Sequence, residues 1–130
     1  MNLEQIETIF MGKQGATKDF PFGEETIVFR VMDKMFGLIS LKTTPLNINL
    51  KCDPNDAIAY RDIYECVNPG YHMNKKHWNT ITLDGTIKEE ILKDMVNESY
   101  DLIVSKLTKK QKEELFFNNY KMKNDILSHK

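Results

Sequence analysis

Residues 66–85 concentrate the polar and aromatic chemistry of this 130-residue chain. They read CVNPGYHMNKKHWNTITLDG and hold two of the three histidines, the only tryptophan and an adjacent lysine pair. Pro69 and Gly70 form a turn signal, because proline fixes φ and glycine accepts positive φ. The residues that follow, as far as Leu83, are rich in aromatic and β-branched side chains and predict a β-hairpin.

The turn of this hairpin decides which side chains share a face. Asparagine tolerates the left-handed region, so we expect Asn74 and Lys75 to form a tight two-residue turn. That turn sets His72 directly opposite His77 and leaves Lys75 and Lys76 at the solvent-exposed tip. A shift of the turn by one residue would break the histidine pairing.

The composition is that of an ordinary globular protein, with 41% hydrophobic and 28% charged residues. The net charge of −1 argues against avid, non-specific binding of nucleic acid, so any basic surface must be local. We expect a single domain over residues 1–117 and a Lys/Asn-rich tail over 118–130 that frays. No secretory leader and no apolar run of roughly 18 residues is visible, so we expect a cytoplasmic protein with Cys52 and Cys66 as free thiols.

Hydrophobic periodicity predicts the helices and strands in the first half of the chain. A helix is expected over residues 3–11, begun by a capping box of Asn2 and Gln5. A loop over residues 13–25 should anchor on the core through Phe20 and Phe22. Three antiparallel strands are then expected over 26–32, 35–41 and 46–51, with Asp33 and Lys34 as the first turn and Gly37 as a bulge or close approach.

The second half carries most of the helices. Asp53 caps a short helix that should run to about Tyr64. A long helix should begin at a capping box over residues 86–89 and cover a sheet with a broad apolar face, on which Ser99 allows close packing. Thr108 and Gln111 repeat the capping-box pattern and start a last helix. Helices at both ends with antiparallel strands between them imply an α+β sandwich.

Four motifs of the chain are similar to those of one known family. They read DFPFGEET at 19–26, LKCDP at 50–54, PGYHMNKKHWNT at 69–80 and SYDL at 99–102. On these motifs the chain resembles the MmcQ/YjbR family over about residues 1–115, and the third motif is highly specific. Lys13 and Gln14 stand where members often have Leu-Pro, a departure confined to a predicted loop.

The resemblance implies a CyaY-like (frataxin-like) sandwich and a DNA-binding role through a "double wing" of β-hairpins, without catalysis or a cofactor. Lysines at the two hairpin tips would meet phosphates, and an asparagine can read a base edge or a phosphate. Double-stranded DNA is the expected partner of a monomer or weak homodimer, with modest affinity because the lysines are few. The expected site residues are Lys34, His72, Asn74, Lys75, Lys76 and His77.

Two other site chemistries stay open on the residues alone. His72 and His77 can be two metal ligands with Cys66 or an acid as a third, but two imidazoles without a clear partner are a weak signal, and we expect no metal. Cys52 precedes a helix N-terminus and follows Lys51, and both features lower a thiol pKa. A small buried hydrophobe is nevertheless the expected role of Cys52, and no catalysis is expected.

The alternative function is a protein-binding or small-ligand-binding module. Asn47, Asn49 and Lys51 alternate with apolar residues and should form the wet face of their strand. This face can form a cleft close to the hairpin, around Tyr71, His72, His77 and Trp78. Salt-dependent retention of duplex DNA would favour the DNA-binding function, and salt-insensitive association with a protein or metabolite would favour the module.

Overall fold

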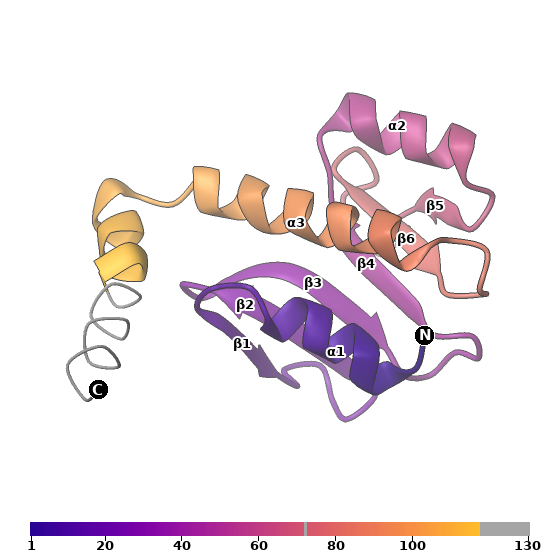
Figure 1. Cartoon of the computed structure of the whole chain (residues 1–130), viewed down its shortest axis with the longest axis horizontal. Coiled ribbons are helices and arrows are strands. Elements are labelled where there is room, and N and C mark those ends of the chain that lie inside the picture. The colour runs from indigo at the N-terminus through magenta and orange to yellow at the C-terminus, as the bar shows by residue number, and fades with distance from the viewer. Residues whose placement is uncertain (72, 118–130) are drawn as a thin grey trace.

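The computed structural model describes residues 1–71 and 73–117 and has an α+β fold (Figure 1). In these residues a single antiparallel sheet has the strand order β1-β2-β3-β4-β6-β5. A further helical segment spans residues 109–117. The elements in chain order are α1 (Leu3–Met11), β1 (Ala16–Asp19), β2 (Thr26–Val31), β3 (Lys34–Ser40), β4 (Asn47–Lys51), α2 (Pro54–Ile63), β5 (Val67–Pro69), β6 (Trp78–Thr82) and α3 (Glu89–Ser105).

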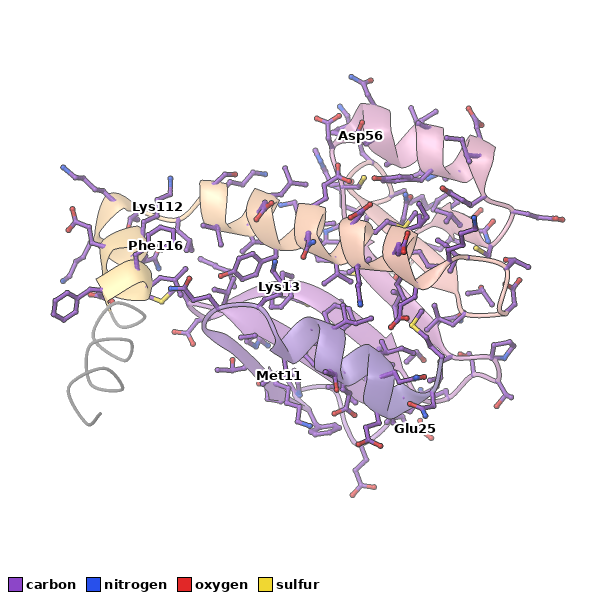
Figure 2. The ribbon with its side chains drawn as sticks, in the orientation of Figure 1. Met11, Lys13, Glu25, Asp56, Lys112 and Phe116 are labelled. Atoms are coloured by element: carbon purple, nitrogen blue, oxygen red, sulfur yellow. The ribbon has the colours of Figure 1, made fainter. Side chains whose placement is uncertain are left out.

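One face of the sheet, which we call the helix face, is covered by α1 and α3 (Figure 1). The alternating residues of β2 confirm the predicted pattern, since Ile27, Phe29 and Val31 are all buried in this layer. The broad apolar face of α3 is also confirmed. Lys13, just after α1, donates a hydrogen bond to Asn97 on α3 at 2.7 Å and so links the two helices (Figure 2).

Ser99 fastens α3 to the sheet. Its Oγ donates to the carbonyl of Phe36 at 2.6 Å and accepts from the N–H of Lys51 at 2.9 Å. The ladder between β3 and β4 ends at the pair Gly37–Leu50, so the serine bridges the two strands where they part. The close packing predicted at this small residue is confirmed, because Ser99 is completely buried.

The other face of the sheet, which we call the open face, carries no helix of the described chain. In the described chain, helical residues contribute to the main core, whereas strand and loop residues alone build a second, smaller cluster on the open face. Residues paired in register lie on the same face, so the strand register identifies one row that crosses the whole sheet. That row is Asp19, Val28, Leu38, Asn49, Thr80 and Asn68.

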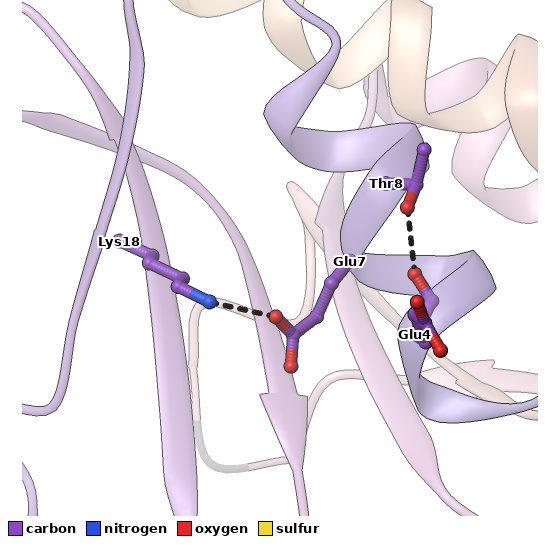
Figure 3. Close-up of polar contacts among 4 residues, drawn as sticks. All are labelled: Glu4, Glu7, Thr8 and Lys18. Carbon is purple, nitrogen blue, oxygen red and sulfur yellow. Dashed lines mark hydrogen bonds and ion pairs between the residues drawn. The ribbon is translucent and has the colours of Figure 1, made fainter.

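The predicted loop over residues 13–25 is partly wrong, because β1 pairs with β2 as an edge strand. Its sequence, ATKD, holds one apolar residue and therefore lacks the alternation that marks a strand. Lys18 of β1 pairs with Glu7 of α1 at 2.8 Å, and Figure 3 shows this contact beside the Thr8–Glu4 hydrogen bond within α1. Phe20 and Phe22 are 48% and 69% exposed, so the expected anchoring on the core is also wrong.

The first hairpin turn lies one residue earlier than expected. Met32 and Asp33 both have positive φ, 48° and 66°, as in the primed turns that suit a two-residue hairpin. Lys34 consequently opens β3 rather than closing the turn. The close approach predicted at Gly37 is confirmed, since a Cβ there would collide with the ring of Phe10.

The helix caps agree with those predicted from the sequence except at α3. The boxes at Asn2 with Gln5 and at Thr108 with Gln111 are formed, with bonds of 2.9 to 3.1 Å. At α3 the expected box is wrong, because the helix begins at Glu89 and its N-cap makes no side-chain bond. Thr86 instead donates its N–H to Asp84 Oδ1 at 3.0 Å, in a turn that precedes the helix. No helix within residues 1–71 and 73–117 has the length and apolarity to cross a membrane.

Candidate functional site

The connection between β5 and β6 carries most of the predicted site residues. The two strands pair from Val67–Ile81 to Pro69–Asn79, so residues 70–77 form a loop and the expected two-residue turn is wrong. Within this loop the N–H groups of His77 and Trp78 both donate to the carbonyl of Asn74, at 3.1 and 2.9 Å, which makes a single helical turn. His77 therefore precedes the strand, and its expected partner His72 lies outside the described residues.

The tip of the loop is exposed and basic. Asn74 Oδ1 accepts the N–H of Lys76 at 3.0 Å, an Asx-type turn that fixes the local backbone. The ammonium group of Lys75 lies 5.1 Å from the centre of the exposed Tyr71 ring, within cation–π range. Among the described residues, neither Lys75 nor Lys76 forms an ion pair with a carboxylate.

Arg61 holds this loop from α2. Its guanidinium donates to the carbonyl of Lys75 and, at 2.7 Å, to Oδ1 of the buried Asn79. On the other side of the loop, the N–H of Cys52 donates to the carbonyl of His77 at 2.7 Å. The sequence carries no signal for the role of Arg61, because a basic residue is ordinary in the last turn of a helix.

The structure brings Asn74, Lys75, Lys76 and His77 together and leaves Lys34 elsewhere. Lys34 is exposed at the start of β3, beside the β2–β3 turn. Figure 1 shows that turn well apart from the β5–β6 loop, which lies next to α2. The two predicted tips therefore belong to different parts of the surface.

A cluster of titratable groups lies where α2 meets α3. The Tyr60 hydroxyl donates to Glu98 at 2.9 Å, and the Cys52 sulfur lies 3.7 Å from the same carboxylate. Burial raises the pKa of Cys52 to about 12, and the negative charges of Glu98 and Asp56 contribute to the rise. The lowered pKa that Lys51 and the helix N-terminus suggested for Cys52 is therefore not found, and the buried, free thiol expected there is confirmed.

Glu98 itself is shifted toward its protonated form. Burial raises its pKa, and the neighbouring Asp56 carboxyl of α2 raises it further, whereas the hydrogen bond from Tyr60 acts in the opposite direction. Figure 2 shows Asp56 on the helix that lies above this junction.

Metal ligation has little support in the described chain. Residues 1–71 and 73–117 contain no group of three histidine, cysteine, aspartate or glutamate side chains placed to hold an ion. Cys66, the suggested third ligand, is buried in the main core.

The open face holds a cleft of about 440 Å³. It lies between the loop that precedes β2 and the β5–β6 loop, over the row that contains Leu38 and Asn49. Trp78 is only 8% exposed and packs with Val28 and Leu38 in the open-face cluster, so it supports this surface from within. The cleft is lined by Phe22, Thr26, Met35, Leu38, Ser40, Lys42, Asn49 and Met73.

Lys51 was expected on the same wet face of its strand and does not line this cleft. Its pKa is lowered because the side chain is partly buried and lies close to the positive charge of Lys106.

Comparisons with known proteins agree with the fold. The model of the YjbR family matches residues 11–102. "Uncharacterized protein YbdF" of Escherichia coli O157:H7 is 44% identical over 92 residues, which cover 70% of this chain and 75% of YbdF. "Uncharacterized protein YjbR" of Escherichia coli K12 is 26% identical over 112 residues, covering 86% and 95%. The crystal structure of Deinococcus radiodurans DR2400, with a DUF419 domain, superposes with a TM-score of 0.81 at 36% identity, covering 88% of this chain and 87% of DR2400.

Proposed function

This chain belongs to the YjbR family, and from that premise we propose that it is a non-catalytic protein that binds double-stranded DNA. The names of its relatives state no activity, so the proposal depends on the chemistry of the 70–77 loop. The observation that supports it is a basic tip, Lys75 and Lys76, presented on a backbone held from two sides.

Rigid presentation matters because a mobile loop loses conformational freedom when it binds. Arg61 and Cys52 already hold the backbone of residues 75 and 77, so less entropy remains to be lost. Lysine ammonium groups contact phosphate oxygens without reading sequence, and the Asn74 amide can donate to a phosphate. His77 is half-buried beside them and adds positive charge only when protonated.

The proposal includes Lys34 as a second point of contact. A duplex that spans both tips would reproduce the double-wing arrangement of a CyaY-like sandwich. With a net charge of −1, we propose weak, salt-sensitive binding by a cytoplasmic monomer or weak homodimer.

The test is a fluorescence-anisotropy titration of a DNA duplex at several low salt concentrations. The double variant Lys75→Ala/Lys76→Ala should bind more weakly, and its salt slope should fall by about 0.9 for each phosphate that the variant no longer neutralises. The matched control is Lys109→Ala/Lys110→Ala, which removes another adjacent, exposed lysine pair. Equal binding by the wild type and the loop variant, or no binding by the wild type, contradicts the proposal.

A second candidate function is a small-ligand or protein-binding module on the open face. The cleft of about 440 Å³ favours it, because this volume falls in the range of small-molecule sites. Association that does not weaken with salt would distinguish it from DNA binding.

A further inference from the structure

We propose that the cleft on the open face binds a small organic anion, a free molecule with an aromatic or aliphatic body and a single carboxylate-type group. This site is distinct from the lysine tip and does not depend on DNA binding. The inference rests on how apolar and hydrogen-bond-donating side chains divide the lining of the cleft.

The floor of the cleft comes from paired residues of the central strands. Leu38 of β3 pairs with Asn49 of β4, and Thr26 of β2 pairs with Ser40 of β3. Leu38, Ser40 and Asn49 each have a ladder partner on both sides, so their backbone groups are used in ladders. A peptide strand therefore has no edge to extend at this place, which favours a free small molecule over a polymer.

Part of the lining of the cleft is apolar. Leu38 and Met35 belong to the open-face cluster, and Met73 closes it from the β5–β6 loop. Methionine side chains adapt their shape to a bound molecule. Phe22 also lines the cleft and is 69% exposed, so a ligand body would cover this ring and remove apolar surface from water.

The rest of the lining offers hydrogen-bond donors. Asn49 Oδ1 accepts from the Thr80 hydroxyl at 2.6 Å, which directs the acceptor of this amide to the protein and leaves its NH₂ group to donate. The hydroxyls of Thr26 and Ser40 also line the cleft. Among the described residues that line the cleft, Lys42 carries the only formal charge, and that charge is positive. This set of groups complements an anion.

Glu25 is the group that opposes an anion here. Its carboxylate lies 3.4 Å from the ammonium of Lys42, and the two side chains are 65% and 64% exposed. Figure 2 shows Glu25 at the edge of the molecule, near the start of α1. An exposed pair of this kind contributes little to stability, so a ligand carboxylate can displace Glu25 from Lys42.

The test uses anilinonaphthalene sulfonate, a fluorescent aromatic anion, titrated into the full chain. Lys42→Ala should weaken its affinity by up to about fivefold, and Glu25→Gln should strengthen it by a similar factor. Glu24→Gln is the matched control, because Glu24 is the exposed neighbour that does not line the cleft, and it should change nothing. Phenylnaphthylamine, the uncharged analogue of the probe, should bind more weakly than the anion.

A second measurement locates the probe. Amide chemical-shift changes should centre on Ser40, Lys42 and Asn49, and Ser40→Phe, which fills the cleft, should abolish them; Met73→Ala serves if that variant does not fold. Shifts centred on the exposed Ile58 and Ile63 of α2 would overturn the proposal. So would equal affinity for the uncharged analogue, or affinity that is unchanged in both Lys42→Ala and Glu25→Gln.

Discussion

Glu98 is a residue whose ionisation opposes folding. Its pKa lies above the usual 4.5, first because of burial and then because Asp56 stands beside it, although Tyr60 donates to its carboxylate. The folded protein therefore binds a proton at this position more tightly than the unfolded chain does. Such a group stabilises the fold below pH 4.5, and that contribution is lost as the pH rises through the folded-state pKa.

We expect Glu98→Gln to remove this loss of stability with rising pH. The amide oxygen still accepts the Tyr60 hydroxyl, but the side chain no longer ionises. The free energy of unfolding, measured by urea denaturation between about pH 4 and pH 8, should fall less with pH in the variant than in the wild type. Glu90→Gln, an exposed position in the first turn of α3, is the control. If the free energy of unfolding depends on pH in the same way in Glu98→Gln and in the wild type, Glu98 is not the group that causes the decline.

Trp78 is the largest residue of the open-face cluster, and its removal should be costly. The ring is 8% exposed and packs with Val28 and Leu38. We expect Trp78→Ala to lower the free energy of unfolding by about 3–5 kcal/mol. Tyr71→Ala, at a position 63% exposed, should change it by less than about 0.5 kcal/mol. If Trp78→Ala lowers the free energy of unfolding by less than about 1 kcal/mol, the ring instead belongs to a functional surface.

The β5–β6 loop shows how one element takes its shape from another. Its backbone turns at Asn74 through local bonds, but its position is held by Arg61 from α2. Asn79, at the base of the loop, joins the same network by donating to the carbonyl of Ala57 at 3.2 Å. Hydrogen bonds therefore join the loop and α2 into one structural unit.

Arg61→Ala should loosen this unit. It leaves Oδ1 of the buried Asn79 without its donor, which should lower the free energy of unfolding by about 1–3 kcal/mol. Amide hydrogen exchange of residues 74–77 should accelerate by more than the global change in stability. Arg30→Ala is the matched control, because the Arg30–Asp19 pair at 3.3 Å is at the surface and should contribute less than about 1 kcal/mol. Equal effects of the two variants would show that Arg61 does not hold the loop.

At the scale of the whole molecule, we propose that residues 1–117 form one folding unit. The last described segment is attached to the rest through Leu115, which is 4% exposed in the main core. The carbonyl of Leu115 accepts a hydrogen bond from Gln14 at 2.8 Å, so this segment contacts the turn between α1 and β1. The predicted tail over residues 118–130 lies outside the described residues.

Truncation tests this boundary. A chain ending at Phe117 should retain the thermal midpoint of the full chain to within about 2 °C. A chain ending at Leu107 lacks Leu115 and should unfold at a clearly lower temperature, because deleting a buried leucine costs about 2–5 kcal/mol. A lowered midpoint in the longer truncation would place part of the folding unit beyond residue 117.

The order of most elements could be predicted from the residues. Alternation in β2 and β4, the periodic apolar face of α3 and the caps at Asn2 and Asp53 are local patterns, and each is formed. The edge strand β1 could not be predicted, because its residues are mostly exposed and show no alternation of apolar and polar side chains. Nor could the long β5–β6 loop, because its position depends on contacts with Arg61 and Cys52 that are distant in the chain.

The candidate sites also contain features that the sequence predicts and features that only the tertiary structure shows. The exposed lysine pair at 75 and 76 is readable in the sequence, since charge at a turn is a local property. The separation of Lys34 from that pair, the raised pKa of Glu98 and the donor-lined cleft arise only when strands and helices far apart in the chain are packed together. Local propensity sets which segments form, whereas the relative placement of side chains depends on tertiary packing, which no single segment encodes.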